Sequence, residues 1–144
     1  MEGQDARNDT RQDRDLGNFV FVDASALIAL ADRDDASHQA AVDAYREMIG
    51  SGLRLFTTDL ALVAAHEIIL AALGSTVART WLAQCAIFVQ SITLPDLEEG
   101  RRAIEEGTCP PRATLAEAVH LAVLDRLGVT DVFAVDRAFL EMLG

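Results

Sequence analysis

The sequence predicts a three-layer α/β fold with a central parallel sheet of about four strands. Short apolar runs alternate with longer helical segments, and the runs are continuously apolar, as expected of strands buried on both faces. Parallel neighbours need crossover connections, so the helices between them must cover both faces of the sheet. The 144 residues, 51% of them hydrophobic and 24% charged, suit one domain with a full core.

The first part of that domain contains two strands, each followed by helix. Residues 1–18 are polar and are predicted to form a disordered tail, which leaves 19–144 as the domain. Asp, Ser and Thr before the helices and Gly after them mark the helix ends. The expected elements are a strand at 19–23, a helix from about 25, a helix at 36–49, a strand at 53–56 and a helix that follows Thr57–Asp59 and ends at Leu73.

The second part of the domain continues the alternation. Pro95 is typical of a first helical turn, and Gly107 and Gly128 are typical of residues that end helices. The expected elements are a helix at 76–90, a strand at 92–94, a helix from Pro95 to about 107, a helix at 114–127, a strand at 132–135 and a short helix from Arg137.

Four carboxylates lie at predicted strand ends or on apolar helices. Asp23 closes the first strand and Asp136 the last, so both should emerge at the carboxyl edge of the sheet, where α/β proteins bind ligands. Glu67 and Glu117 lie in apolar helical segments, where an unpaired buried carboxylate is costly. Because a hard divalent cation would relieve that cost, we predict Asp23, Glu117 and Asp136 as metal ligands, with Glu67 as a fourth catalytic acid.

Each acid also has an ordinary structural role open to it. Asp23 and Asp136 could cap the helices that follow them, and Glu117 could form a capping box with Thr114. Glu67 could reach solvent from the edge of an apolar helix stripe. Convergence favours a functional site, because the expected topology brings two strand-end acids to adjacent strand ends with both helices nearby.

Three segments from Phe19 onward resemble the PIN domain, specifically the VapC-type toxin ribonucleases: VDASALIAL, TTDLALVAAHE and TLAEAVHLAVLDRLGVTDVFAVDRAF. The last segment carries most of the resemblance, with an acid-bearing helix, a glycine break, a strand and an Asp-Arg-x-Phe turn in the family's order. The resemblance implies a PIN-like α/β/α fold and RNA cleavage that depends on Mg²⁺ or Mn²⁺ held by clustered acids. It also implies that the chain is the toxin of a toxin–antitoxin pair, a homodimer bound by a basic antitoxin protein.

Two positions depart from the family's pattern. Glu117 stands where the family usually has Asp, and the family's helix glutamate falls on Ala64, with Glu67 one turn later. Glu67 would be displaced by about 4.5 Å along the helix with similar facing, so it could reach the same ion or act as an outer group. The alternative function is a catalytically degenerate PIN domain that acts as a protein- or RNA-binding module.

Ser25 and Arg137 are the substrate-binding candidates. Ser25 could bond a metal-bound water or a neighbouring carboxylate, or be an ordinary helix cap. Arg137 is placed to contact a phosphate, or it could be an exposed Arg beside Glu141. His120, like His66, follows an apolar helical spacing that favours a satisfied histidine at the core edge over a metal ligand.

Charge and motif content exclude several other classes. The net charge of −11 means that RNA binding must depend on a local patch or on a metal that makes the acidic pocket attract phosphate. A haloacid-dehalogenase-type phosphatase would need a second Asp where Ser25 stands, and a response-regulator receiver would need a Lys, which the chain lacks. No apolar run could span a membrane and no signal peptide is visible, so a cytoplasmic protein with reduced cysteines is expected.

Overall fold

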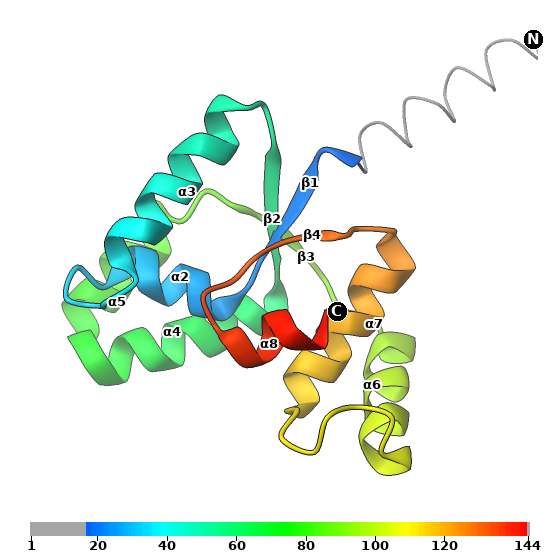
Figure 1. Cartoon of the computed structure of the whole chain (residues 1–144). Coiled ribbons are helices and arrows are strands. Elements are labelled where there is room, and N and C mark those ends of the chain that lie inside the picture. The colour runs from blue at the N-terminus through cyan, green and yellow to red at the C-terminus, as the bar shows by residue number, and fades with distance from the viewer. Residues whose placement is uncertain (1–16, 144) are drawn as a thin grey trace, which may run out of the picture.

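The computed structural model describes residues 17–143 as a four-stranded sheet between layers of helices (Figure 1). The strands are β1 (Phe19–Val22), β2 (Arg54–Thr58), β3 (Phe88–Gln90) and β4 (Asp131–Phe133), in the spatial order β3-β2-β1-β4. Every pairing between neighbours is parallel. The predicted three-layer parallel architecture is confirmed, and the predicted tail lies outside the described residues except for Gly17 and Asn18.

Alternate side chains of β1 enter two separate cores, because successive residues of a strand point to opposite faces. Val20 and Val22 pack against one layer of helices, whereas Phe21 packs against the other. The first layer contains α2 (Ala24–Ala31), α3 (His38–Gly50), α4 (Asp59–Leu73) and α5 (Ser75–Gln84). The second contains α7 (Leu115–Leu127) and α8 (Arg137–Met142), with α6 (Leu94–Glu106) packed on α7. Among the described helices, none is long and apolar enough to cross a membrane.

The third strand lies earlier in the chain than the sequence predicts. β3 occupies 88–90, whereas the predicted strand at 92–94 leads into α6. Thr93 and Asp96 form a capping box: Thr93 Oγ1 accepts from the Asp96 amide at 3.2 Å, and Asp96 Oδ2 accepts from the Thr93 amide at 2.8 Å. These bonds commit Thr93 to a helix start, so the strand must precede it. The preceding helix, predicted to reach residue 90, accordingly ends at Gln84.

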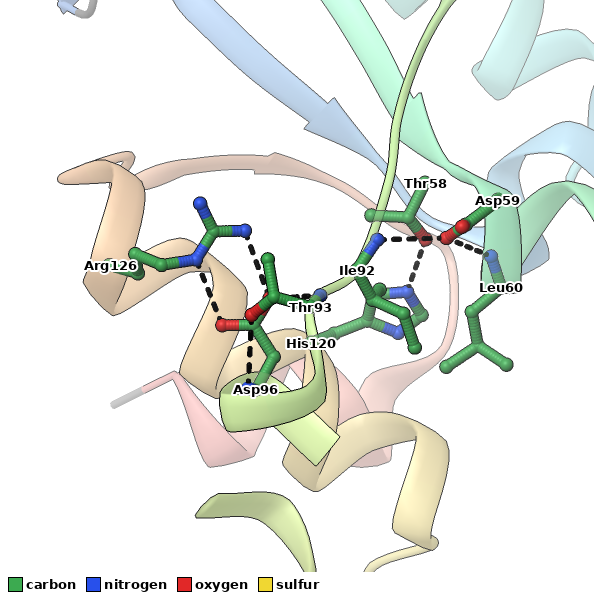
Figure 2. Close-up of polar contacts among 8 residues, drawn as sticks. All are labelled: Thr58, Asp59, Leu60, Ile92, Thr93, Asp96, His120 and Arg126. Carbon is green, nitrogen blue, oxygen red and sulfur yellow. Dashed lines mark hydrogen bonds and ion pairs between the residues drawn. The ribbon is translucent and has the colours of Figure 1, made fainter. Parts of the chain in front are cut away.

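The same carboxylate also joins α6 to α7 (Figure 2). Asp96 is only 3% exposed, and it receives hydrogen bonds from Arg126 Nε and Nη2, both at 2.9 Å. The paired oxygens of the carboxylate match the planar guanidinium, which gives two parallel charge-assisted bonds. This ion pair therefore fixes one end of α7 against the start of α6.

Gly100 allows α6 and α7 to approach closely. A Cβ at this position would lie 2.6 Å from Val119 Cγ2 and 2.9 Å from the Val119 backbone nitrogen. We expect Gly100→Ala to destabilise the fold by about 1–3 kcal/mol, because the clash involves backbone and outweighs the helix propensity gained. Urea denaturation measures the effect, with Gly50→Ala as control, since a Cβ there would meet nothing within 4 Å. Equal midpoints for Gly100→Ala and the wild type would contradict the close packing.

Candidate functional site

Asp23 and Asp136 lie together where the adjacent strands β1 and β4 end. Asp23 follows β1 directly, and its amide donates to Phe133 O of β4 at 2.9 Å. Ser25 joins the two ends: its Oγ donates to Asp23 Oδ2 at 2.7 Å and accepts from the amides of Val135 and Asp136 at 3.1 and 3.3 Å. The two strand-end acids thus occupy neighbouring carboxyl ends, and Ser25 makes one of the contacts predicted for it, the bond to a neighbouring carboxylate.

The three predicted metal acids all cap helices. Asp23 and Asp136 each accept from the amide two residues later, at 3.1 and 2.9 Å. Glu117 Oε1 accepts from the amide and hydroxyl of Thr114 at 3.4 and 3.1 Å. Each carboxylate uses one oxygen in this way, and no described residue donates to Asp23 Oδ1, Asp136 Oδ2 or Glu117 Oε2. Capping therefore orients each carboxylate and leaves its second oxygen available to a ligand.

The second oxygen of Glu117 is the most unusual of the three. Oε2 is buried and has no hydrogen-bond partner within the described residues, a situation that costs about 1–3 kcal/mol unless a donor or cation meets it. Glu117 also borders a hollow of about 420 Å³ that Ala138 of α8 lines. Ala138 donates to Asp136, so Glu117 lies on the same side of the molecule as the strand-end acids.

The three acids are not assembled into a closed set of ligands. Within residues 17–143, no group of three or more His, Cys, Asp or Glu side chains is arranged to hold a metal ion. The predicted convergence of all three carboxylates is therefore not present in this conformation. The three acids nevertheless have the chemistry that Mg²⁺ or Mn²⁺ requires, because hard cations bind carboxylate oxygens. Each acid has one carboxylate oxygen that receives no hydrogen bond from a described residue.

Glu67, the predicted fourth acid, is exposed on α4, whereas Ala61, Ala65 and Ile69 form the buried face of that helix. Ala64, at the family's glutamate position, is half-buried. We expect Glu67→Gln to change RNA cleavage by less than about threefold, because an exposed carboxylate can lose its charge without disturbing its neighbours.

Initial rates on a labelled oligoribonucleotide check this expectation. Glu98→Gln, an exposed glutamate on α6, is the control. A loss above about tenfold for Glu67→Gln alone would establish Glu67 as the fourth catalytic acid.

Arg137 is exposed at the first position of α8. The ion pairs among the described residues do not include one between Arg137 and Glu141. The guanidinium beside Asp136 is thus available to a phosphate, and its role in substrate binding stays a prediction.

A buried polar group around His120 was only partly foreseen (Figure 2). His120 is 3% exposed, and its Nε2 lies 2.7 Å from Thr58 Oγ1 at the end of β2. Burial lowers the pKa of His120, while the negative charges of Asp23 and Asp59 oppose that shift. The prediction of a satisfied core histidine is confirmed, but its link to Thr58 was not predicted. The spacing of three residues between Glu117 and His120 could have signalled that they share a helix face.

The sequence matches no protein-family model and no curated protein. Among solved structures, the fold is similar to that of VapC20 from Mycobacterium tuberculosis, a sarcin–ricin loop-cleaving toxin. The TM-score is 0.72 at 20% sequence identity, over 85% of this chain and 93% of VapC20. The PIN-like α/β/α fold expected from the sequence is thereby confirmed. At this identity the likeness establishes the fold, so the activity must be argued from the residues.

Proposed function

We propose that this chain, which has the fold of a VapC toxin, is a metal-dependent endoribonuclease and the toxin of a toxin–antitoxin pair. The observation that carries the proposal is the set of capped carboxylates on one side of the molecule, each with an oxygen that accepts no hydrogen bond from a described residue. Likeness to a toxin that cleaves the sarcin–ricin loop supports RNA as the substrate class.

Asp23, Glu117 and Asp136 would hold Mg²⁺ or Mn²⁺, which when bound supplies Lewis acidity that stabilises charge developing on the scissile phosphate. Ser25 keeps the Asp23 carboxylate in a fixed orientation, and Arg137 pairs with a phosphate oxygen. A carboxylate accepts the proton of the attacking water as the new P–O bond forms. The bond from phosphorus to the ribose 3′ oxygen breaks, and that oxygen takes up a proton from solvent water. The products carry a 5′-phosphate and a 3′-hydroxyl.

The proposal also includes two partners, a basic antitoxin and a second copy of this chain. A net charge of −11 suits a basic antitoxin, since opposite charges speed association. Exposed apolar side chains on α4 and α5, among them Val63, Ile68 and Leu82, support a homodimer in which that surface is covered.

Cleavage assays with the purified protein, freed of antitoxin, test the activity. Labelled oligoribonucleotides, including a sarcin–ricin loop hairpin, should be cut with Mg²⁺ or Mn²⁺ and left intact with a chelator, giving 5′-phosphate products. Calorimetry should show Mn²⁺ binding. Protein that neither cleaves RNA nor binds Mn²⁺ would overturn the proposal in favour of the binding-module alternative, which Ala64 at the family's glutamate position supports.

A further inference from the structure

A buried bridge joins α7 to the end of β2. Thr58 is fully buried, and its Oγ1 accepts from the Ala61 amide at 3.0 Å, which caps α4. The same oxygen lies 2.7 Å from His120 Nε2. The His120 ring packs on Phe21, with 4.9 Å between ring centroids. One short chain of contacts therefore connects the start of α4, strands β1 and β2, and the first half of α7. Figure 2 shows the contact of Thr58 with His120 in this chain.

Burial favours the neutral form of the His120 ring, since it lowers the pKa of His120. A neutral ring that carries its proton on Nδ1 accepts the Thr58 hydroxyl proton at Nε2, across the distance of 2.7 Å. The short contact and the packing of the ring on Phe21 hold this part of α7 against the sheet.

The other polar and close contacts of α7 hold it to α6 rather than to the sheet. Arg126 pairs with Asp96, and Val119 meets Gly100, both on α6. Leu121, Leu124 and Leu127 of α7 also pack on the core that contains Phe21. His120 lies three residues after Glu117, before these leucines, so the bridge is the polar attachment to the sheet nearest that carboxylate.

We propose that His120 is a positioning residue: bonded to Thr58 and packed on Phe21, it sets where Glu117 stands relative to Asp23 and Asp136. The effect of His120 on catalysis rests on the proposed function. Its effect on the position of the first turn of α7 does not depend on that function and can be tested separately.

Four variants test the positioning role of His120. His120→Leu removes the hydrogen bond to Thr58 and keeps an apolar side chain in the same buried space, whereas His120→Gln retains a group that accepts the Thr58 proton. Val123→Ala is the matched control, because Val123 is fully buried on α7 one turn later and takes no part in the bridge. Thr58→Val breaks the same bond from the other side, should His120→Leu fail to fold.

Two measurements are made on each variant. Hydrogen exchange reports on the amides of Glu117 and Ala118, which donate to Thr114 Oγ1 and O at 3.1 Å in both cases. Calorimetry reports the affinity for Mn²⁺. We expect His120→Leu to speed exchange at both amides and to weaken Mn²⁺ binding by about tenfold or more. His120→Gln should recover most of both effects, and Val123→Ala should show neither.

The outcomes separate the two proposals. Unchanged exchange in both His120→Leu and Thr58→Val, or equal effects in Val123→Ala, would overturn the positioning role whatever the nuclease assay gives. Wild-type protein that binds no Mn²⁺ and cuts no RNA would overturn the proposed function, while the exchange measurement would still decide whether His120 positions Glu117.

Discussion

Asp23→Asn is expected to slow RNA cleavage by about 10²–10⁴-fold and to leave the fold intact. One carboxylate oxygen accepts both bonds from Ser25, and the carbonyl of Asn can accept the same two. The amide nitrogen then takes the place of Oδ1, the oxygen without a hydrogen bond from a described residue. A cation ligand and proton acceptor is thereby replaced by a neutral donor, with little change in shape.

Asp131→Asn is the matched control for this change. Asp131 is exposed at the first position of β4, hence at the opposite edge of the sheet from Asp23. Both variants lose one negative charge, so a general effect of net charge on RNA binding would appear in both. Single-turnover cleavage and Mn²⁺ calorimetry should separate them. Equal rates for the two variants would rule out Asp23 as a catalytic acid.

Asp96→Asn is expected to lower the free energy of unfolding at neutral pH by about 2–3 kcal/mol. The substitution leaves the guanidinium of Arg126 against a neutral amide, whose NH₂ group cannot accept one of the two bonds at 2.9 Å. Because 37% of the Arg126 side chain is exposed, water compensates in part and the loss falls below that of a fully buried pair.

The effect of Asp96→Asn should also depend on pH. The hydrogen bond from Arg126 is the main reason that the pKa of Asp96 lies below its ordinary value. A lowered pKa in the folded state stabilises the protein above the unfolded value of about 3.9, and this is lost as pH falls through the folded value. The difference between wild type and variant should therefore be full at about pH 7 and shrink below about pH 4.

Urea titrations at both pH values measure this difference. Glu99→Gln, which breaks an exposed pair with Arg102 at 3.1 Å, should cost less than about 1 kcal/mol at either pH. A difference for Asp96→Asn that persists unchanged in acid would show that the ion pair is not its cause.

Local patterns predicted the caps and strand ends well, because those features depend on residues a few positions apart. Asp23 follows β1 directly as expected, and Thr114 with Glu117 forms the anticipated capping box. The last strand was predicted at 132–135 but ends at Phe133, so Asp136 lies three residues beyond it. The third strand was misplaced because the apolar residues before Gln90 suit helix or strand equally.

The features that were not predicted depend on contacts between residues far apart in the sequence. Asp59 Oδ1 accepts from the amide of Ile92, 33 residues away, which helps to hold the loop after β3. The bridge from Thr58 to His120 spans 62 residues, and the pair of Asp96 with Arg126 spans 30. Such pairings have no local signature, so neither the bridge nor the ion pair could be predicted from spacing.

The position of Ser25 has a consequence for when the candidate site can form. Its hydroxyl oxygen accepts a hydrogen bond from the amide of Val135, 110 residues later in the chain. A growing chain on the ribosome therefore contains Asp23 long before it contains the residues that Asp23 must meet. Pairing across so large a separation is slow, because the entropy of loop closure must be lost first. The site is thus completed only after β4 has been synthesised, and a chain interrupted before β4 lacks it.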